Sequence, residues 1–466
     1  MYTIQMIVTF VVVLGAMIVI HEFGHFMVAK LFGVRVEVFS IGFGKRLWGH
    51  HKGDTDYRIS LIPLGGYVKM AGENLDEQVT GAPDEFMSKP KWQRLCIAFA
   101  GPAMNILTAL AIPAGMAMIT YEMPAYENGP AVIGAVDPGS AAEQAGMQPG
   151  DLIVKIGNQE NPTWTDVKDL VVLSPGHSIK VAVRRGQETR QIDLQPSSVN
   201  FDEEKVGNAG IYPVLGPNSK LVVGTVQADK PAGEAGLKPY DQILAINGQT
   251  VEQNFAGRNT LIAAIQNSGG QPVTLTVKRG EETIDIKATP QLDDGKFRIG
   301  FTPAAQDGDT IVTRLSPPKA IKYSIDTNWR FLRLTEIALA QVFVGQRSAR
   351  DTLAGPIQIL KFSGQAASEG AWSVLNLTGI LSLNLGIFNL LPIPVLDGGL
   401  ILMLFLDAVL GLVGMPLTLR IKERMMQVGF VVLMLLMAFV IVNDISKVIP
   451  RSSSQQQNSQ PASSPK

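Results

Sequence analysis

Four long stretches without a charged residue dominate the pattern of hydrophobic and polar positions along the chain. They cover residues 2–21, 95–121, 371–396 and 425–443. Each is close to, or longer than, the roughly 20 residues that a helix needs to cross a bilayer. The pattern therefore predicts a polytopic α-helical membrane protein with four transmembrane helices.

Basic residues near the span ends predict the orientation, because Lys and Arg favour the cytoplasmic side. They follow the first span and precede the second and the fourth: Lys30, Arg35, Lys45, Arg46, Lys89, Lys91, Arg94, Arg420, Lys422 and Arg424. With four spans, both termini and the long segment 122–370 are expected across the membrane, in the periplasm of a Gram-negative cell. The first span lacks the basic start of a signal peptide and is expected to stay on the mature protein.

Between the first two spans, residues 34–70 alternate in polarity, are rich in β-forming residues and are punctuated by glycine. This pattern predicts β-hairpins. We expect a membrane-associated hairpin sheet that dips into the bilayer, with an edge that pairs with an extended substrate. An ordinary cytosolic hairpin is the alternative.

An internal repeat with a spacing of 90 residues lies between the second and third spans. The segment Glu143–Gly146 recurs as Gly233–Gly236, and Asp151 recurs as Asp241. So long a period predicts two tandem α+β domains, each with its own core. The pattern resembles a pair of PDZ domains in the circularly permuted bacterial form. Their grooves bind peptide ends, and the alternative is that they are steric spacers.

The rest of the chain is less informative. Residues 317–343 have the mixed apolar and basic pattern of a helix at the membrane surface or of a plain soluble helix, and the polar tail is expected to be disordered. The predicted domains are the first span (1–30), the β region (31–94), the second span (95–121), PDZ-like domains (122–216 and 217–306), a periplasmic amphipathic linker (307–370), a broken third span (371–419), the fourth span (420–448) and the tail (449–466).

Composition narrows the choice of partners. The 466 residues include 40 Lys and Arg and 41 Asp and Glu, and the net charge of -1 gives no indication of a nucleic-acid partner. The one cysteine, Cys96, cannot form an internal disulfide and is expected to pack in an apolar segment.

The first span ends in the motif His21-Glu22-Phe23-Gly24-His25. Two histidines four positions apart share one face of a helix, where they can bind one zinc ion. A carboxylate beside the metal, Glu22, can take a proton from water for amide hydrolysis. Ionisable groups inside a bilayer are costly, so a functional site explains the motif better than ordinary core packing does.

The third span contains Pro392 and Pro394, which break a helix and are tolerated in lipid only where the irregular backbone lines a buried site. Asp397 follows them and needs a partner. Two histidines and this carboxylate make a three-ligand zinc site with a fourth position open. A lone aspartate that caps the next half helix is the alternative. Asn105, in the second span, is interpreted as a helix–helix contact.

Together these motifs and the repeat resemble the site-two protease family of intramembrane zinc metalloproteases, over nearly the whole chain except the tail. The resemblance implies zinc as the cofactor and a set of site residues: His21, His25 and Asp397 as zinc ligands, Glu22 as general base, and Asn389, Gly42, Phe43 and Gly44 as substrate-binding residues. The last three match the family's membrane-reentrant β loop.

The resemblance also implies a substrate and a location. Substrates would be single-span membrane proteins of the anti-sigma factor type, already trimmed, and remnant signal peptides. Cleavage would release a cytoplasmic fragment for envelope stress signalling, in the bacterial inner membrane with the active site toward the cytoplasmic side. The PDZ pair would act as a periplasmic size filter. Two rivals are a peptide-sensing membrane receptor with a structural metal site, and a zinc protease for soluble or misfolded proteins whose third ligand is a downstream glutamate.

Overall fold

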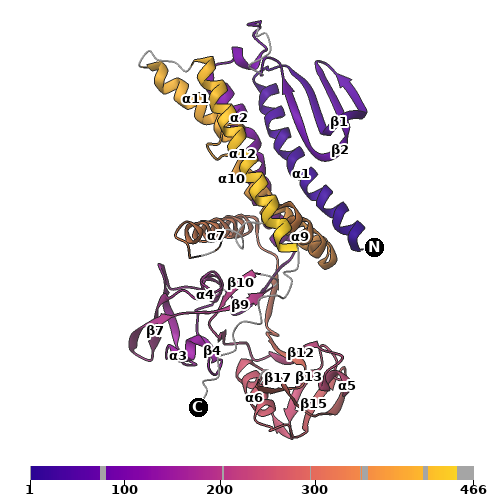
Figure 1. Ribbon diagram of the computed structural model, residues 1–466, viewed down its shortest axis with the longest axis vertical. Helices are drawn as coiled ribbons and strands as arrows, with labels where there is room; N and C mark the ends of the chain where they lie inside the picture. Colours follow the sequence, from indigo (N-terminus) through magenta and orange to yellow (C-terminus); the bar gives the residue numbers. More distant parts are fainter. Residues whose placement is uncertain are drawn as a thin grey trace, which may run out of the picture. The chain divides into compact units, whose positions relative to one another are not determined.

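The computed structural model describes residues 2–73, 80–127, 129–201, 204–293, 295–346, 348, 355–412 and 418–448. The chain forms two compact units (Figure 1). The first, which we call the helical unit, comprises Met1–Ile119, Leu315–Thr335 and Arg347–Lys466. The second, the αβ unit, comprises Thr120–Arg314 and Glu336–Gln346. The tail that the sequence predicts to be disordered, residues 449–466, lies outside the described residues.

Four helices in the described part of the chain are long and apolar enough to cross a membrane, which confirms the prediction of four such helices. They are α1 (Tyr2–Leu31), α2 (Lys91–Ile119), α10 (Ala371–Asn389) and α12 (Leu419–Val448). Large apolar side chains of α12, such as Val428 and Leu435, are more than half exposed. An apolar surface on all sides of a helix is typical of a membrane span. Helix α2 packs against α1, α10 and α11 (Asp397–Leu412) and is central in this unit.

Two long strands, β1 (Val36–Lys52) and β2 (Thr55–Met70), follow α1, with a short helix η1 (Phe86–Ser88) before α2. The hairpin folds back on itself, because Val38 of β1 pairs with both Lys69 and Asp56 of β2. Gly42 has a φ of 91°, and a Cβ there would lie 2.7 Å from the carbonyl oxygen of Ile62. The last residues of β2 form the edge of the sheet that lies beside α1 (Figure 1).

The third apolar segment is broken at its prolines. Helix α10 ends at Asn389, and α11 begins at Asp397. Gly398 permits the tight reversal between them, because a Cβ at this position would lie 2.3 Å from the carbonyl oxygen of Leu390. The irregular backbone therefore ends directly at the aspartate that the sequence singles out.

Helices α7 (Pro317–Phe343) and α9 (Pro356–Glu369) precede α10. The first turn of α9 is bound by the buried carboxylate of Asp444 on α12. The backbone N–H groups of Gly355, Ile357 and Gln358 donate to it at 3.1, 2.8 and 3.3 Å. A carboxylate at a helix N-terminus also stabilises the helix dipole, so Asp444 joins α12 to α9.

The αβ unit contains two similar copies between the paired strands β3 (Tyr121–Pro124) and β20 (Thr310–Thr313). The first copy comprises β4 (Ile133–Val136), α3 (Ala141–Gln144), β5 (Leu152–Ile156), β6 (Gln159–Glu160), α4 (Trp164–Val172), β7 (Ile179–Arg185), β8 (Glu188–Leu194), β9 (Ser197–Phe201), β10 (Glu204–Asn208) and β11 (Ile211–Pro213). The second comprises β12 (Lys220–Val226), α5 (Pro231–Glu234), β13 (Gln242–Ile246), β14 (Gln249–Thr250), α6 (Phe255–Gln266), β15 (Val273–Arg279), β16 (Glu282–Ala288), β17 (Gln291–Asp293), β18 (Lys296–Arg298) and β19 (Phe301–Gln306). Each copy has its own buried hydrophobic cluster.

Each copy contains an equivalent ion pair between an arginine and a buried aspartate. Arg185 donates to both carboxylate oxygens of Asp151 at 2.7 and 2.8 Å, and Arg279 donates to those of Asp241 at 2.7 and 2.6 Å. Burial is the largest single effect and would raise the pKa of each aspartate, but the hydrogen bonds and charge of the arginine, together with a backbone N–H, outweigh it and hold each pKa below its ordinary value. The equivalent aspartates, Asp151 and Asp241, therefore have the same structural role in the two copies.

Candidate metal centre

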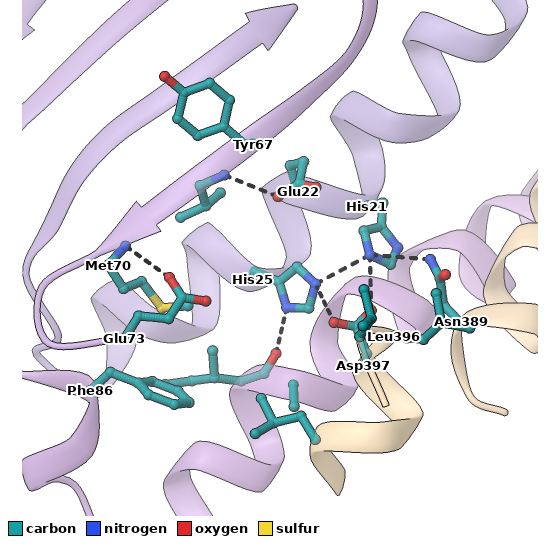
Figure 2. A pocket seen from close by; sticks show the side chains of 15 residues that line it. His21, Glu22, His25, Tyr67, Met70, Glu73, Phe86, Asn389, Leu396 and Asp397 are labelled. Carbon is teal, nitrogen blue, oxygen red and sulfur yellow. Dashed lines mark hydrogen bonds and ion pairs between the residues drawn. The ribbon is translucent and has the colours of Figure 1, made fainter. Parts of the chain in front are cut away.

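Potential metal ligands from two distant parts of the chain converge in the helical unit. His21 and His25, one turn apart on α1, and Asp397 at the start of α11 place ligand atoms within 4.8 Å of one another. The two Nε2 atoms are 3.2 Å apart, and carboxylate oxygens of Asp397 lie 3.0 Å from His21 Nε2 and 3.5 Å from His25 Nε2 (Figure 2). In a tetrahedral zinc site with bonds of about 2.0–2.1 Å, ligand atoms are roughly 3.3 Å apart. The observed spacings therefore fit zinc.

Both histidines also have a partner for the other ring nitrogen. His25 Nδ1 lies 2.7 Å from the carbonyl oxygen of Ile97. A carbonyl can only accept, so Nδ1 carries the proton and Nε2 presents its lone pair. A second hydrogen bond of this kind is typical of metal-bound histidines, because it fixes the tautomer and the ring orientation.

Asn105 of α2 makes the corresponding contact with His21. The residue is fully buried, and its Nδ2 atom lies 3.2 Å from His21 Nδ1. Its Oδ1 atom has no hydrogen-bond partner within the described ranges. The oxygen and nitrogen of an amide are nearly isosteric, and exchanging them lets Oδ1 accept from His21 Nδ1–H. This orientation satisfies the buried oxygen and leaves a lone pair on His21 Nε2.

Two lone pairs and a carboxylate oxygen then face one another. Such an arrangement is repulsive unless a cation lies between the three atoms, and nitrogen and oxygen donors in this number suit zinc. His21, His25 and Asp397 would hold the ion and leave a fourth position for water or substrate.

Two glycines permit α1 and α2 to approach closely at this point. A Cβ on Gly101 of α2 would lie 2.2 Å from His25 Nε2 and 2.8 Å from His21 Nε2. A Cβ on Gly24 of α1 would lie 2.3 Å from the carbonyl oxygen of Ala100. Any larger residue at position 101 would occupy the space of the ligand atoms themselves.

The break between α10 and α11 supplies the other wall of the site. The amide Nδ2 of Asn389 lies 3.4 Å from His21 Nε2, so this side chain faces the same point as the ligands (Figure 2). Val395 has a φ of 98°, a conformation that costs a β-branched residue strain. The strain coincides with the turn that brings Asp397 to the histidines.

A cavity of 320 Å³ opens beside the three ligands, and the carboxylates of Glu22 and Glu73 line it. Glu22 Oε2 accepts from the backbone N–H of Val68 at 3.1 Å, and Glu73 Oε2 accepts from that of Met70 at 3.2 Å (Figure 2). Burial raises the pKa of the Glu73 carboxyl above its ordinary value, and the Met70 N–H opposes this. The pocket therefore contains a second carboxylate near Glu22.

The segment Gly42-Phe43-Gly44 lies on β1 and does not line this cavity. Phe43 reaches it indirectly, because its ring stacks on that of Tyr67, a lining residue, with the centroids 6.0 Å apart. Gly42 and Gly44 both have positive φ angles. The structure thus places Phe43, between these two glycines, against a residue of the cavity wall.

Sequence reasoning overlooked two residues of the site. Asn105 was interpreted as a helix–helix contact; its backbone carbonyl does accept from Ser382 Oγ at 3.0 Å, but its side chain contacts His21. Glu73 carried no signal of its own, since a glutamate after a predicted strand is usual. The amide of Asn105 inside an apolar span was the one signal available.

Comparison with known proteins agrees with this geometry. The model of peptidase family M50 matches residues 9–436. The regulator of sigma-E protease RseP from Salmonella typhimurium is 34% identical over 461 residues, which cover 94% of this chain and 98% of the relative. RseP from Escherichia coli is 33% identical over 455 residues, with the same coverage. A putative zinc metalloprotease from Vibrio cholerae is 33% identical over 466 residues and covers 95% and 98% of the two chains.

Proposed function

Because the chain belongs to peptidase family M50 and is a zinc metalloendopeptidase of the site-2 type, we propose that it cuts peptide bonds within membrane-spanning segments of other proteins. Its substrates are single-span membrane proteins of the anti-sigma factor type whose outer part has been trimmed, and remnant signal peptides. The relatives' name, regulator of sigma-E protease, supports release of a cytoplasmic fragment for envelope stress signalling. The observation that carries the proposal is the convergence of His21, His25 and Asp397 beside Glu22 on helices apolar enough to cross a bilayer.

The chemistry needs a base next to the metal ligands. Zinc held by His21, His25 and Asp397 supplies a Lewis acid that polarises the scissile carbonyl and makes the attacking water more acidic. Glu22 takes a proton from that water and delivers it to the leaving nitrogen. The N–H of Val68 holds one oxygen of this carboxylate, which orients the group toward the cavity.

Substrate binding requires an extended chain. A transmembrane helix uses its backbone groups in its own hydrogen bonds, so it must unwind locally before its peptide bonds can be attacked. We propose that the unwound segment adds to the free edge of β2, since main-chain hydrogen bonds recognise a strand whatever its side chains. Asn389 then holds the substrate backbone near the metal ligands, and Gly42-Phe43-Gly44 supports the sheet that carries the edge.

The two copies of the αβ unit are proposed to be PDZ-like domains that act as a periplasmic size filter. In the second copy, α6 and β19 border a cavity of 550 Å³ lined by Lys230, Ile262, Ile265 and Phe301 among others. β19 is the last strand of its sheet, so an extended peptide end can add to it. The basic Lys230 suits a carboxylate.

The homology and the four apolar helices support an integral protein of the bacterial inner membrane. We propose that both termini and the αβ unit lie in the periplasm, following the positions of the basic residues. The metal site, at the far end of the first span, then lies toward the cytoplasmic side. Water can reach that depth more easily than the bilayer centre.

The test uses full-length protein in detergent or liposomes with a labelled single-span substrate. Glu22→Gln should keep one zinc per chain and lower the cleavage rate at least about a hundredfold, as expected for loss of a general base. Asp397→Ala should lose zinc and activity together, and a chelator should abolish wild-type cleavage. Normal cleavage by Glu22→Gln would refute the assignment, and full zinc content in Asp397→Ala would favour the rival zinc protease whose third ligand is a downstream glutamate.

A further inference from the structure

Two backbone N–H groups on the free edge of β2 point into the cavity. Those of Val68 and Met70 donate to the carboxylates of Glu22 and Glu73. The opposite edge of this strand faces β1. The N–H of Ala71 shows this, because it donates to the carbonyl oxygen of Arg35, the residue before β1, at 2.9 Å. Residues two apart in a strand present their N–H groups to the same edge. The protein's own glutamates therefore occupy the N–H groups of both Val68 and Met70.

The local structure holds Glu73 at this place. Gly72 has a φ of 64°, which turns the chain back over Met70 directly after β2 ends. On its other side the turn is packed against Glu85, because a Cβ on Gly72 would lie 2.9 Å from Glu85 Cβ. Glu85 is itself buried and accepts from the N–H and hydroxyl of Thr80. The Glu73 carboxylate is thus part of a fixed turn and not a surface group that happens to reach the cavity.

A strand that adds to this edge needs backbone N–H groups there for its own carbonyl oxygens, and Met70 N–H is the donor that does not hold the proposed general base. We propose that Glu73 is a positioning residue that takes the place of a substrate carbonyl at Met70 N–H and gives up this donor when the substrate strand binds. The inference rests on the proposed function, in which β2 receives the substrate. Only an unwound segment can offer a free carbonyl in this position, so the exchange admits extended chains and disfavours intact helices.

The two variants Glu73→Ala and Glu73→Gln separate this role from others. Alanine removes the competitor, so KM for a membrane-embedded substrate should fall about three- to tenfold, the range expected for one net hydrogen bond, with kcat unchanged. Glutamine still accepts from Met70 N–H without the charge and should give a smaller decrease. Amide hydrogen exchange at Met70 in the substrate-free protein should become faster in the alanine variant and stay near wild type in the glutamine variant.

The control is Glu37→Ala, which removes a carboxylate from the same sheet outside the cavity, where it pairs with Lys69 at 2.9 Å. It should leave KM, kcat and the exchange of Met70 unchanged. A fall in kcat with constant KM in both Glu73 variants would overturn the proposal in favour of proton transfer by Glu73. Loss of zinc from the glutamine variant, or a higher KM in the alanine variant, would also overturn it. If wild-type protein does not cut the substrate at all, the proposed function fails; if it does and KM stays constant in the variants, this inference alone fails.

Discussion

The contact between Asn105 and His21 gives the sharpest test of the metal centre. Asn105→Leu replaces the amide with an apolar group of similar size and removes the acceptor for His21 Nδ1–H. The ring can then move its proton to Nε2, where Asp397 Oδ2 lies 3.0 Å away and accepts it. That tautomer has no lone pair on Nε2, the atom that faces the other ligands. Loss of such a supporting partner typically weakens metal binding 10- to 100-fold, or about 1.4–2.7 kcal/mol.

Asn105→Asp separates the two orientations of the amide. A carboxylate can only accept, so it keeps the bond to His21 Nδ1–H if the oxygen of Asn105 faces the ring. Zinc affinity should then stay within a few-fold of wild type. If the amide instead donates to Nδ1, as the Nδ2 contact at 3.2 Å would have it, the wild-type ring carries its proton on Nε2, and aspartate should strengthen zinc binding by accepting from Nδ1–H.

The assay is a zinc competition titration with a chromophoric chelator, on full-length protein in detergent, alongside thermal unfolding of the zinc-free protein. Asn376→Leu is the matched control, because it makes the same change at an exposed position of another apolar helix and should leave zinc affinity unchanged. Equal losses in Asn105→Leu and Asn105→Asp, with zinc-free stability retained, would refute the tautomer argument. Wild-type zinc affinity in Asn105→Leu would refute the role of this residue altogether.

Two further predictions concern the αβ unit. Arg279→Met leaves Asp241 buried without its arginine partner, so hydrogen exchange of the core strand β15 should become faster at pH 7. The depressed pKa of Asp241 stabilises the folded wild type above the ordinary aspartate pKa of about 4, and this stability is lost as the pH falls further. The difference in β15 exchange rate between variant and wild type should therefore shrink below about pH 4. A difference that stays constant with pH would contradict this linkage. Deleting residues 131–303 should allow cleavage of untrimmed substrate, which a gel assay can follow with trimmed substrate as the control. If the deletion variant still cuts only the trimmed substrate, the size filter is contradicted.

Substrate selection in this protein is proposed to depend on backbone chemistry. The cavity beside the metal ligands is bounded by the edge of β2, the break after α10 and two carboxylates. Under this proposal the enzyme distinguishes substrates mainly by whether a segment can unwind and reach the site, and a filter outside the membrane would add to this selection.

Features with a local physical cause could be read from the sequence. Four uncharged stretches predicted four apolar helices, because a bilayer core has a fixed thickness. The spacing of His21 and His25 predicted a shared helix face, since four residues make about one turn. Pro392 and Pro394 predicted the break that ends at Asp397, because proline lacks the N–H that a helix requires.

Other features came only from contacts between segments that are distant along the chain. Asn105 supports His21, and Gly101 leaves room for the ligand atoms, only because α1 and α2 pack closely at that level. Glu73 competes for the edge of β2 only because a turn folds it back over Met70. Helix and strand patterns report on neighbours a few residues away, whereas these roles depend on which faces meet. The sequence by itself thus determined the elements and the chemistry of the ligands, and tertiary packing decided which groups support them.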